Sequence, residues 1–288
     1  MNKNVAVIGG DARYLELITQ LQRVTTSIIA VGFDTLAKGF VHATHIKFPA
    51  LPVETMDVVI LPITGVDSKG YVETVFSDQS IQLTKDWFQR LPSHALVITG
   101  MANAHLQQMA KDTNTSLVPL LDRDDVAIYN SIPTAEGALL MAMEHTDYTI
   151  HSSRIIVVGF GRVGDTVANK FSALGAHVSV CAKDVSDLAR ITERGYVSIP
   201  LEQLPQHTPT CDILINTVPA KVIQKDSMRF LPAHSMIIDL ASHPGGTDFI
   251  YAKQRGIKAY LAKSLPGIVA PKTAGKILAD VILHMLKD

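Results

Sequence analysis

Short runs of β-branched and apolar residues recur along this chain, and longer amphipathic stretches separate them. Continuous apolar runs with this spacing are typical of parallel strands that helices cover on both faces. The runs form two successive series, so we expect two doubly wound, Rossmann-like α/β domains with parallel sheets and a cleft between the domains. The expected strands are Val5–Ile8, Ser27–Val31, Val58–Leu61, Leu96–Ile98 and Ser116–Val118, then Ile155–Val158, His177–Val180, Ile213–Asn216, Met236–Asp239 and Lys258–Tyr260.

The chain length agrees with two domains, because 288 residues are too many for one ordinary open α/β domain. We expect an N-terminal domain over residues 1–130, a connecting helix over 131–150 and a second domain over 151–269. The segment NSIPTAEGALLMAMEHT reads as the connecting helix, and Pro133 suits its first turn. A final helix over 270–288 is expected to pack back on the first domain, although it could instead complete the second sheet.

Composition and charge narrow the classes of function. The formal net charge is −1 and no basic block is present, which argues against a nucleic-acid partner. No apolar run approaches the roughly 18 residues of a membrane span, and the N-terminus lacks the pattern of a signal peptide. The two cysteines, Cys181 and Cys211, stand far apart, so we expect no disulfide and no metal site, and a reducing cytoplasm fits.

The passage RIIVVGFGRVGDTVANKF carries the most specific motif, a G-x-G-x-x-G between an apolar strand and a helix. In such a turn Gly159 permits the tight bend, Gly161 lets the backbone approach a pyrophosphate, and Gly164 lets helix and strand pack closely. The helix start adds free N–H groups and a positive dipole end. We expect a dinucleotide here rather than a glycine-tight turn without a ligand. The candidate cofactor-binding residues of this turn are Gly159, Phe160, Gly161, Arg162, Val163 and Gly164.

The end of the next strand is expected to select between the two nicotinamide dinucleotides. An NAD-preferring site usually places an acid about 20 residues past the turn, on the ribose hydroxyls. In this chain Ala182 stands there, Lys183 follows, and Arg190 lies one to two helical turns further on. This pattern favours NADP over NAD. The preference reverses if the strand ends two residues later, because Asp184 then becomes the ribose ligand.

The segment INTVPAKVI follows the next strand of the second series. Asn216, Thr217 and Pro219 form a turn of the kind over which the nicotinamide ribose often lies in such folds. An ordinary strand-end turn explains the same residues almost equally well.

The first glycine turn, GGDARY, fits the dinucleotide fingerprint poorly. Counted from Gly9, the second and third glycine positions hold Asp11 and Tyr14. The carboxylate would face the phosphates, and the tyrosine ring would prevent close packing of helix and strand. The turn still offers a helix start at a strand end, and Arg13 suits a carboxylate. We therefore weigh a small-acid site with Gly10 against a plain Asp11 helix cap beside a solvent-facing Arg13.

Several segments together resemble one family. VIGGDARYLELI, DRDDVAIYNSIPTAEGA, GFGRVG, DLASHPGGTDF and LPGIVAPKTAG resemble the A subunit of dipicolinate synthase of spore-forming bacteria over essentially the whole chain. More distantly, the second domain is similar to those of alanine dehydrogenase and the 2-hydroxy-acid dehydrogenases. The catalytic Arg–Glu–His pattern of the latter is not evident here, so their mechanism is not transferred.

The resemblance implies NADP-dependent oxidation of dihydrodipicolinate to dipicolinate (pyridine-2,6-dicarboxylate) in the mother cell of a sporulating bacterium. It also implies a partner, the B subunit of dipicolinate synthase, and we expect a homo-oligomer. Two other functions stay open. One is an NADP-dependent dehydrogenase of another small amino or hydroxy acid, and the other is a non-catalytic protein that binds the cofactor for a partner.

A diacid substrate needs receptors for two carboxylates, and the chain offers three groups of candidates. The first is Gly10, Asp11 and Arg13 at the first glycine turn. The others lie at expected helix starts, where N–H groups are free. They are Asn130, Ser131 and Thr134 on the connecting helix, and Lys272 and Thr273 on the final helix.

The reaction also needs a general base. His243, in ASHPGG just after a strand of the second domain, suits the role by type and place, although most loop histidines are simply exposed. Glu136 is the alternative, either as the base or as a first-turn acid of its helix.

Overall fold

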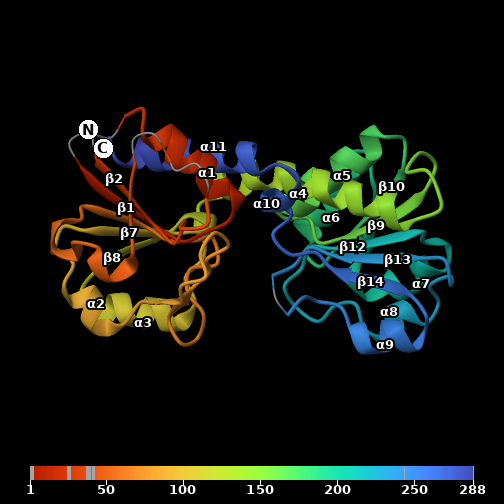
Figure 1. Ribbon diagram of the computed structural model, residues 1–288. Helices are drawn as coiled ribbons and strands as arrows, with labels where there is room; N and C mark the ends of the chain where they lie inside the picture. The colour runs from red at the N-terminus through yellow and green to blue at the C-terminus, as the bar shows by residue number, and fades with distance from the viewer. Residues whose placement is uncertain (1–2, 25–26, 37–39, 41–42, 243, 288) are drawn as a thin grey trace. The chain divides into compact units, whose positions relative to one another are not determined.

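The computed structural model describes residues 3–24, 27–36, 40, 43–242 and 244–287. It divides into two compact units, Met1–Ala127 with Ala270–Asp288, and Ile128–Val269 (Figure 1). Each unit contains a six-stranded parallel sheet, so the predicted α/β class with two doubly wound sheets is confirmed. The cleft between the domains stays a prediction.

The sheet of the first unit has the strand order β3-β2-β1-β4-β7-β8. Along the chain the order reverses between β1 and β4, and ligands bind at such switch points in open α/β sheets. A separate two-stranded antiparallel sheet is formed by β5 and β6. The strands are β1 (Asn4–Ile8), β2 (Ser27–Val31), β3 (Ala43–Ile46), β4 (Val58–Ile60), β5 (Tyr71–Val72), β6 (Ile81–Gln82), β7 (Leu96–Thr99) and β8 (Ser116–Pro119).

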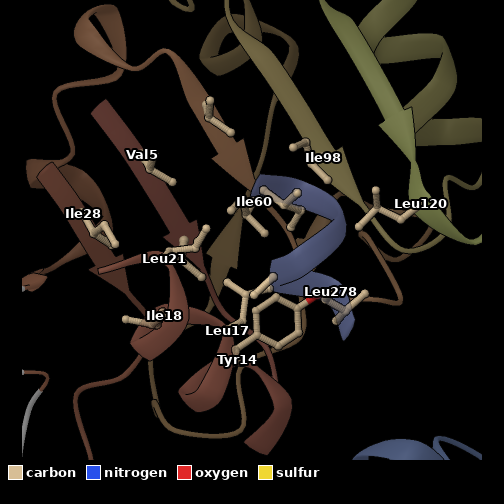
Figure 2. Close-up of a cluster of buried hydrophobic side chains, with 14 of the residues drawn as sticks. Val5, Tyr14, Leu17, Ile18, Leu21, Ile28, Ile60, Ile98, Leu120 and Leu278 are labelled. Carbon is tan, nitrogen blue, oxygen red and sulfur yellow. The ribbon is translucent and has the colours of Figure 1, made fainter. Parts of the chain in front are cut away.

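Alternate residues of β1 face opposite sides of this sheet, and each side has its own apolar core. On one side α1 (Ala12–Leu21) and α11 (Pro271–Met285) lie next to each other, and α2 (Lys85–Gln89) and α3 (Ala104–Asp112) cover the other side (Figure 1). Figure 2 shows the Tyr14 ring of α1 beside Leu278 of α11 within the first core. The final helix therefore contributes to the core of the first unit.

The sheet of the second unit repeats the same order as β11-β10-β9-β12-β13-β14, with its switch point between β9 and β12. The helices α4, α5 and α6 supply apolar residues to one face, and α7, α8 and α9 supply them to the other. The strands are β9 (Arg154–Val158), β10 (His177–Ala182), β11 (Val197–Pro200), β12 (Ile213–Asn216), β13 (Met236–Asp239) and β14 (Lys258–Leu261). The helices are α4 (Asp124–His145), α5 (Arg162–Ala173), α6 (Val185–Glu193), α7 (Leu204–His207), α8 (Lys225–Met228), α9 (Phe249–Gln254) and α10 (Leu265–Val269).

The short strands β5 and β6 were not expected from the sequence. In the two six-stranded sheets, the strands missing from the expected series are β3 and β11. Both lie at an edge of their sheet, and side chains along both are partly exposed to solvent. Their sequences, ATHI and VSIP, therefore lack the continuous apolar run that identifies a strand covered on both faces.

The connecting helix begins earlier than expected. It starts at Asp124, so Pro133 lies inside α4 instead of in its first turn. Two acids, Asp124 and Asp125, occupy the first turn, where negative charge is favourable. The prediction took the proline as the start signal and missed this acidic one.

Candidate functional site

The turn after β9 has the backbone geometry that the glycine fingerprint requires. Gly159 has a φ of +98°, in the region that side chains disfavour, and its N–H donates to the Cys181 carbonyl at 2.8 Å. A Cβ at Gly164 would overlap the Gly159 carbonyl oxygen, so α5 starts directly against the strand end. Both glycines are required by the packing of the turn itself.

Gly161 has a different environment. It precedes α5 with a φ of −82°, and a Cβ added there would find no atom within 4 Å. Packing within the fold therefore does not demand glycine, whereas close approach of a phosphate would. Among the described residues, no backbone acceptor takes the N–H groups of Phe160, Gly161 or Val163. The open face and the free donors fit the pyrophosphate of a dinucleotide.

Two of the residues expected near the nicotinamide ribose pack against the glycine turn or are buried beside it. The Thr217 hydroxyl donates to the Val158 carbonyl at 2.9 Å and lies against Gly159 and Gly164. Asn216 is fully buried, and its amide donates to the Val218 carbonyl and to Asp239. Thus the Asn216 side chain is committed to protein partners, because burial leaves it no face toward a ligand.

Buried Asp239, the last residue of β13, organises the neighbouring loop. One carboxylate oxygen accepts from the Asn216 amide at 2.8 Å and the Ala241 N–H at 3.1 Å. The other accepts from the Gly246 N–H at 2.8 Å and the Thr247 hydroxyl at 2.7 Å. This network ties the strand ends of β12 and β13 to the loop that contains the candidate base. That candidate, His243, lies outside the described residues.

The strand that selects the ribose, β10, ends at Ala182, two residues after the expected strand end at Val180 and at the position that the count from the glycine turn gives for the ribose ligand. Lys183 and Arg190 are both exposed. Asp184 comes two residues after the strand end as the N-cap of α6, yet its side chain makes no capping hydrogen bond. Asp184, whose carboxylate would favour NAD if it ended the strand, therefore lies beyond the last residue of β10.

The first glycine turn differs from the expected acid receptor. The Gly9 N–H donates to the Val31 carbonyl at 2.8 Å, and the Gly10 N–H donates to the Glu73 carbonyl at 2.9 Å. Gly10 therefore has no free N–H for a substrate carboxylate, which corrects that part of the prediction. Tyr14 fills the space beside Gly10, and burial raises the pKa of its phenol well above the ordinary value. A dinucleotide cannot approach this turn as it would a G-x-G-x-x-G turn.

Asp11 and Arg13 form an ion pair that neither sequence interpretation contained. Asp11 caps α1 by accepting the Arg13 N–H, as the helix-cap alternative predicted. The Arg13 side chain, however, is buried, with 4% of the residue exposed, and its Nε and Nη2 atoms bond the same carboxylate at 2.6–3.1 Å. Asp11 thus occupies the Nε/Nη2 edge, one of the two edges through which an arginine binds a carboxylate with two donors. Within the described chain Nη1 makes no hydrogen bond, so Nη1 is the guanidinium nitrogen left for a ligand.

The candidates on α4 lie in the interior of the helix instead of at its start. Ser131 is fully buried, with its hydroxyl bonded to the Ile128 carbonyl and the Thr166 hydroxyl, each at 2.6 Å. The Thr134 hydroxyl donates to the Asn130 carbonyl at 2.8 Å. The prediction of free N–H groups here is wrong, since α4 begins at Asp124. For the same reason Glu136, which is exposed, is not a first-turn acid.

The start of α11 retains the expected features. Lys272 and Thr273 are exposed in its first turn, and its N-cap, Ala270, offers no side-chain cap. A Cβ at Gly275 would overlap the Arg13 carbonyl oxygen, so the first turns of α1 and α11 touch. The first unit thereby brings Arg13 and Lys272 onto adjoining helix starts.

Sequence reasoning missed Glu73, which stands near the same strand end. Its carbonyl holds the Gly10 N–H, and its carboxylate accepts the Thr64 hydroxyl at 2.9 Å. No local pattern marks it, because Gly10 lies far away along the chain.

Comparisons with known proteins fit both units. The family model of the D-isomer specific 2-hydroxyacid dehydrogenase NAD binding domain matches residues 134–242. The family model of the N-terminal domain of the dipicolinate synthase A subunit matches residues 4–121. The A subunit of dipicolinate synthase from Bacillus subtilis is 47% identical over 284 residues, which are 99% of this chain and 96% of that protein. The chain belongs to the family of dipicolinate synthase A subunits.

Solved structures of the family have the same fold. The dipicolinate synthase A subunit of Bacillus halodurans matches with a TM-score of 0.95 and 48% identity, covering 100% of this chain and 99% of that one. Its Bacillus subtilis counterpart gives a TM-score of 0.93 and 46% identity, covering 100% and 96%. A transhydrogenase from Sinorhizobium meliloti gives 0.68 at 14% identity, covering 98% and 93%, and shows the fold alone.

Family membership and the dehydrogenase-type domain support an oxidoreductase with a nicotinamide cofactor, and the name of the family implies a second, partner subunit. Within the described ranges, no helix combines the length and apolar character that crossing a membrane needs. The same ranges contain no group of three His, Cys, Asp or Glu side chains that could hold a metal ion.

Proposed function

We propose that this chain oxidises dihydrodipicolinate to dipicolinate with NADP, together with the B subunit of dipicolinate synthase. One observation carries the proposal: a dinucleotide turn with an open Gly161 stands in a chain that matches a dipicolinate synthase A subunit along 99% of its length. The mother-cell cytoplasm and a homo-oligomer stay predictions.

The choice of NADP rests on charge at the end of β10. A 2′-phosphate there would meet the Lys183 ammonium, the uncapped start of α6 and, further along that helix, Arg190. An acid at Ala182 would repel the phosphate, and none stands there. These features support NADP over NAD.

The substrate carboxylates would bind the first unit. Arg13 would offer Nη1, while Asp11 holds the guanidinium in place through Nε and Nη2. Lys272, Thr273 and the free N–H groups of the α11 start offer a second anion receptor on the adjoining helix. Two receptors on touching helix starts suit a rigid ring with two carboxylates.

Oxidation of the ring removes one hydride and one proton and leaves an aromatic pyridine, so positioning contributes more than activation of the substrate. NADP, when bound, supplies the hydride acceptor. His243 would take the proton, and the Asp239 network would orient its loop. Glu136, exposed on α4, is the alternative base. Arg13 and Lys272 would hold the diacid during the transfer.

The deciding experiment gives the purified chain dihydrodipicolinate and NADP, with and without the B subunit. Dipicolinate and NADPH absorbance should rise together in equal amounts. Loss of signal in His243→Gln but not in Glu136→Gln would identify the base, provided that both variants still bind NADPH. Cofactor binding without turnover in either mixture would refute the proposed activity and favour a non-catalytic, cofactor-binding role. Turnover of a linear amino or hydroxy acid alone would favour the other dehydrogenase function.

The cofactor preference has its own test. Lys183→Asp should weaken NADPH binding by about tenfold or more, because a phosphate loses a charged partner, and should change NADH binding by less than about threefold. Lys253→Asp on α9 carries the same charge change at another exposed position and serves as the control. Equal losses for both cofactors in Lys183→Asp would remove the 2′-phosphate argument.

A further inference from the structure

The second unit contains a cavity of about 180 Å³ beside the amino ends of β9 and β10. The glycine turn and the ribose-selecting residues follow the carboxyl ends of these strands, so the cavity is at the opposite edge of the sheet from the dinucleotide site. It is lined by Arg154, Ile155, Ile156, His177, Ser179, His207, Thr210 and Cys211.

The register of the sheet explains why basic side chains meet in this cavity. Arg154 and His177 are the first residues of β9 and β10 and pair directly in the parallel ladder. Side chains of paired residues leave the sheet on the same face, so both point toward one side. Ile156 and Ser179, the pair two residues further on, occupy the same face. The sheet therefore supplies the Arg154 cation and the Ser179 hydroxyl to the lining from the same face.

The other lining residues, His207, Thr210 and Cys211, come from the segment between β11 and β12. His207 ends α7, and Thr210 ends the short 3-10 turn Thr208–Thr210 that follows. Buried Cys211 also lines the cavity, and burial raises the pKa of its thiol to about 12, so it stays neutral. This segment adds another imidazole and another hydroxyl to the donors that the sheet supplies.

The polar lining is made of hydrogen-bond donors that the protein leaves unused. Among the described residues, no hydrogen bond or ion pair engages the Arg154 guanidinium or the imidazoles of His177 and His207. None of the eight described lining residues is acidic. The neighbouring acid, Asp212, accepts the Arg154 backbone N–H at 2.7 Å and pairs with His234 at 3.0 Å. A guanidinium with unused donors and no facing carboxylate suits a ligand that brings negative charge.

We propose that this cavity is a second anion site, for a small dianionic oxyanion bound by Arg154, His177 and His207. Its volume is below that of ordinary drug-sized pockets, which favours a compact ligand over a nucleotide. A free phosphate and a small organic diacid share the necessary chemistry, namely two negative charges and several acceptor oxygens.

The test measures binding to the full chain saturated with NADPH, so that the dinucleotide turn is filled. Inorganic phosphate and pyridine-2,6-dicarboxylate are titrated separately by calorimetry. Arg154→Gln should weaken binding by about tenfold or more, because a charged hydrogen-bonding partner is lost. The double variant His177→Gln with His207→Gln should weaken it as well. Arg23→Gln removes the same charge from an exposed position of the first unit and should leave the affinity unchanged.

Each outcome decides the proposal. Arg154-dependent binding of phosphate alone identifies a phosphate site, and Arg154-dependent binding of the dicarboxylate alone identifies an organic-diacid site. Binding that is equal in Arg154→Gln and in the wild type overturns the proposal, as does failure of both ligands to bind. Thermal unfolding of each variant reports whether the fold is intact. Because the readout is binding, the result is independent of whether the chain oxidises dihydrodipicolinate.

Discussion

Replacing Gly161 by alanine separates cofactor binding from folding more sharply than any other change in the dinucleotide turn. The added Cβ meets no protein atom within 4 Å, and a φ of −82° is ordinary for alanine. Alanine is a poorer N-cap than glycine by about 0.5–1 kcal/mol, and it lowers the entropy of the unfolded chain by a similar amount. The free energy of unfolding should therefore change by less than about 0.5 kcal/mol.

The same methyl group would stand where the pyrophosphate approaches the free N–H groups of Phe160 and Val163. Loss of one charged hydrogen bond costs about 1.5–3 kcal/mol, which corresponds to a dissociation constant about 10- to 100-fold higher. Fluorescence titration with NADPH measures the affinity, and urea unfolding without the cofactor measures the stability.

Gly164→Ala is the matched control. Its Cβ would overlap the Gly159 carbonyl oxygen, so it should destabilise the protein by about 1–3 kcal/mol as well as weaken binding. If Gly161→Ala binds NADPH with wild-type affinity, the phosphates do not lie on this turn. If it unfolds as readily as Gly164→Ala, the space above Gly161 is not open.

Three further changes test other parts of the molecule. Arg13→Ala should raise the KM for the diacid by about tenfold or more with the NADPH affinity unchanged, and a fall in that affinity would contradict its place in the substrate site. Asp239→Asn should lower the free energy of unfolding, measured by urea titration, by about 1–3 kcal/mol for each buried donor left unpaired. Thr247→Val removes a single donor and should lower the free energy of unfolding by less than Asp239→Asn does. Burial raises the pKa of the Cys181 and Cys211 thiols to about 12, so mass spectrometry should find neither alkylated by iodoacetamide at pH 8 until urea is added.

The elements that the sequence predicts best are the central strands. Ser27–Val31, Ile213–Asn216 and Met236–Asp239 have the same bounds in the structure as in the prediction. Each is covered on both faces of the sheet. Successive side chains are therefore buried or half-buried, and the sequence of the strand is an almost continuous apolar run. The edge strands β3 and β11 lack this signal because solvent reaches part of each.

The sequence also predicts those features of the candidate site that depend on contiguous residues, and it fails for those that depend on residues distant in the chain. The roles of Gly159 and Gly164 depend on a strand, a turn and a helix that are contiguous in the chain, and the motif predicts their geometry. The surroundings of Gly10 depend instead on Glu73, and the burial of Arg13 depends on packing that includes Gly275 of the final helix. Asp11 is only two residues from Arg13, but their ion pair depends on the burial of the Arg13 side chain, which the local sequence does not specify.

The placement of α11 in the core of the first unit has a consequence for how the protein is made. Leu278 and Ile282 are synthesised after the whole second unit, yet they share a core with Tyr14 and Leu17, which are synthesised before it. On the ribosome the second unit has all its strands before the first unit has its last helix. The amino-terminal unit is therefore the last to be completed, and the apolar face that α11 covers needs protection while the rest of the chain is translated.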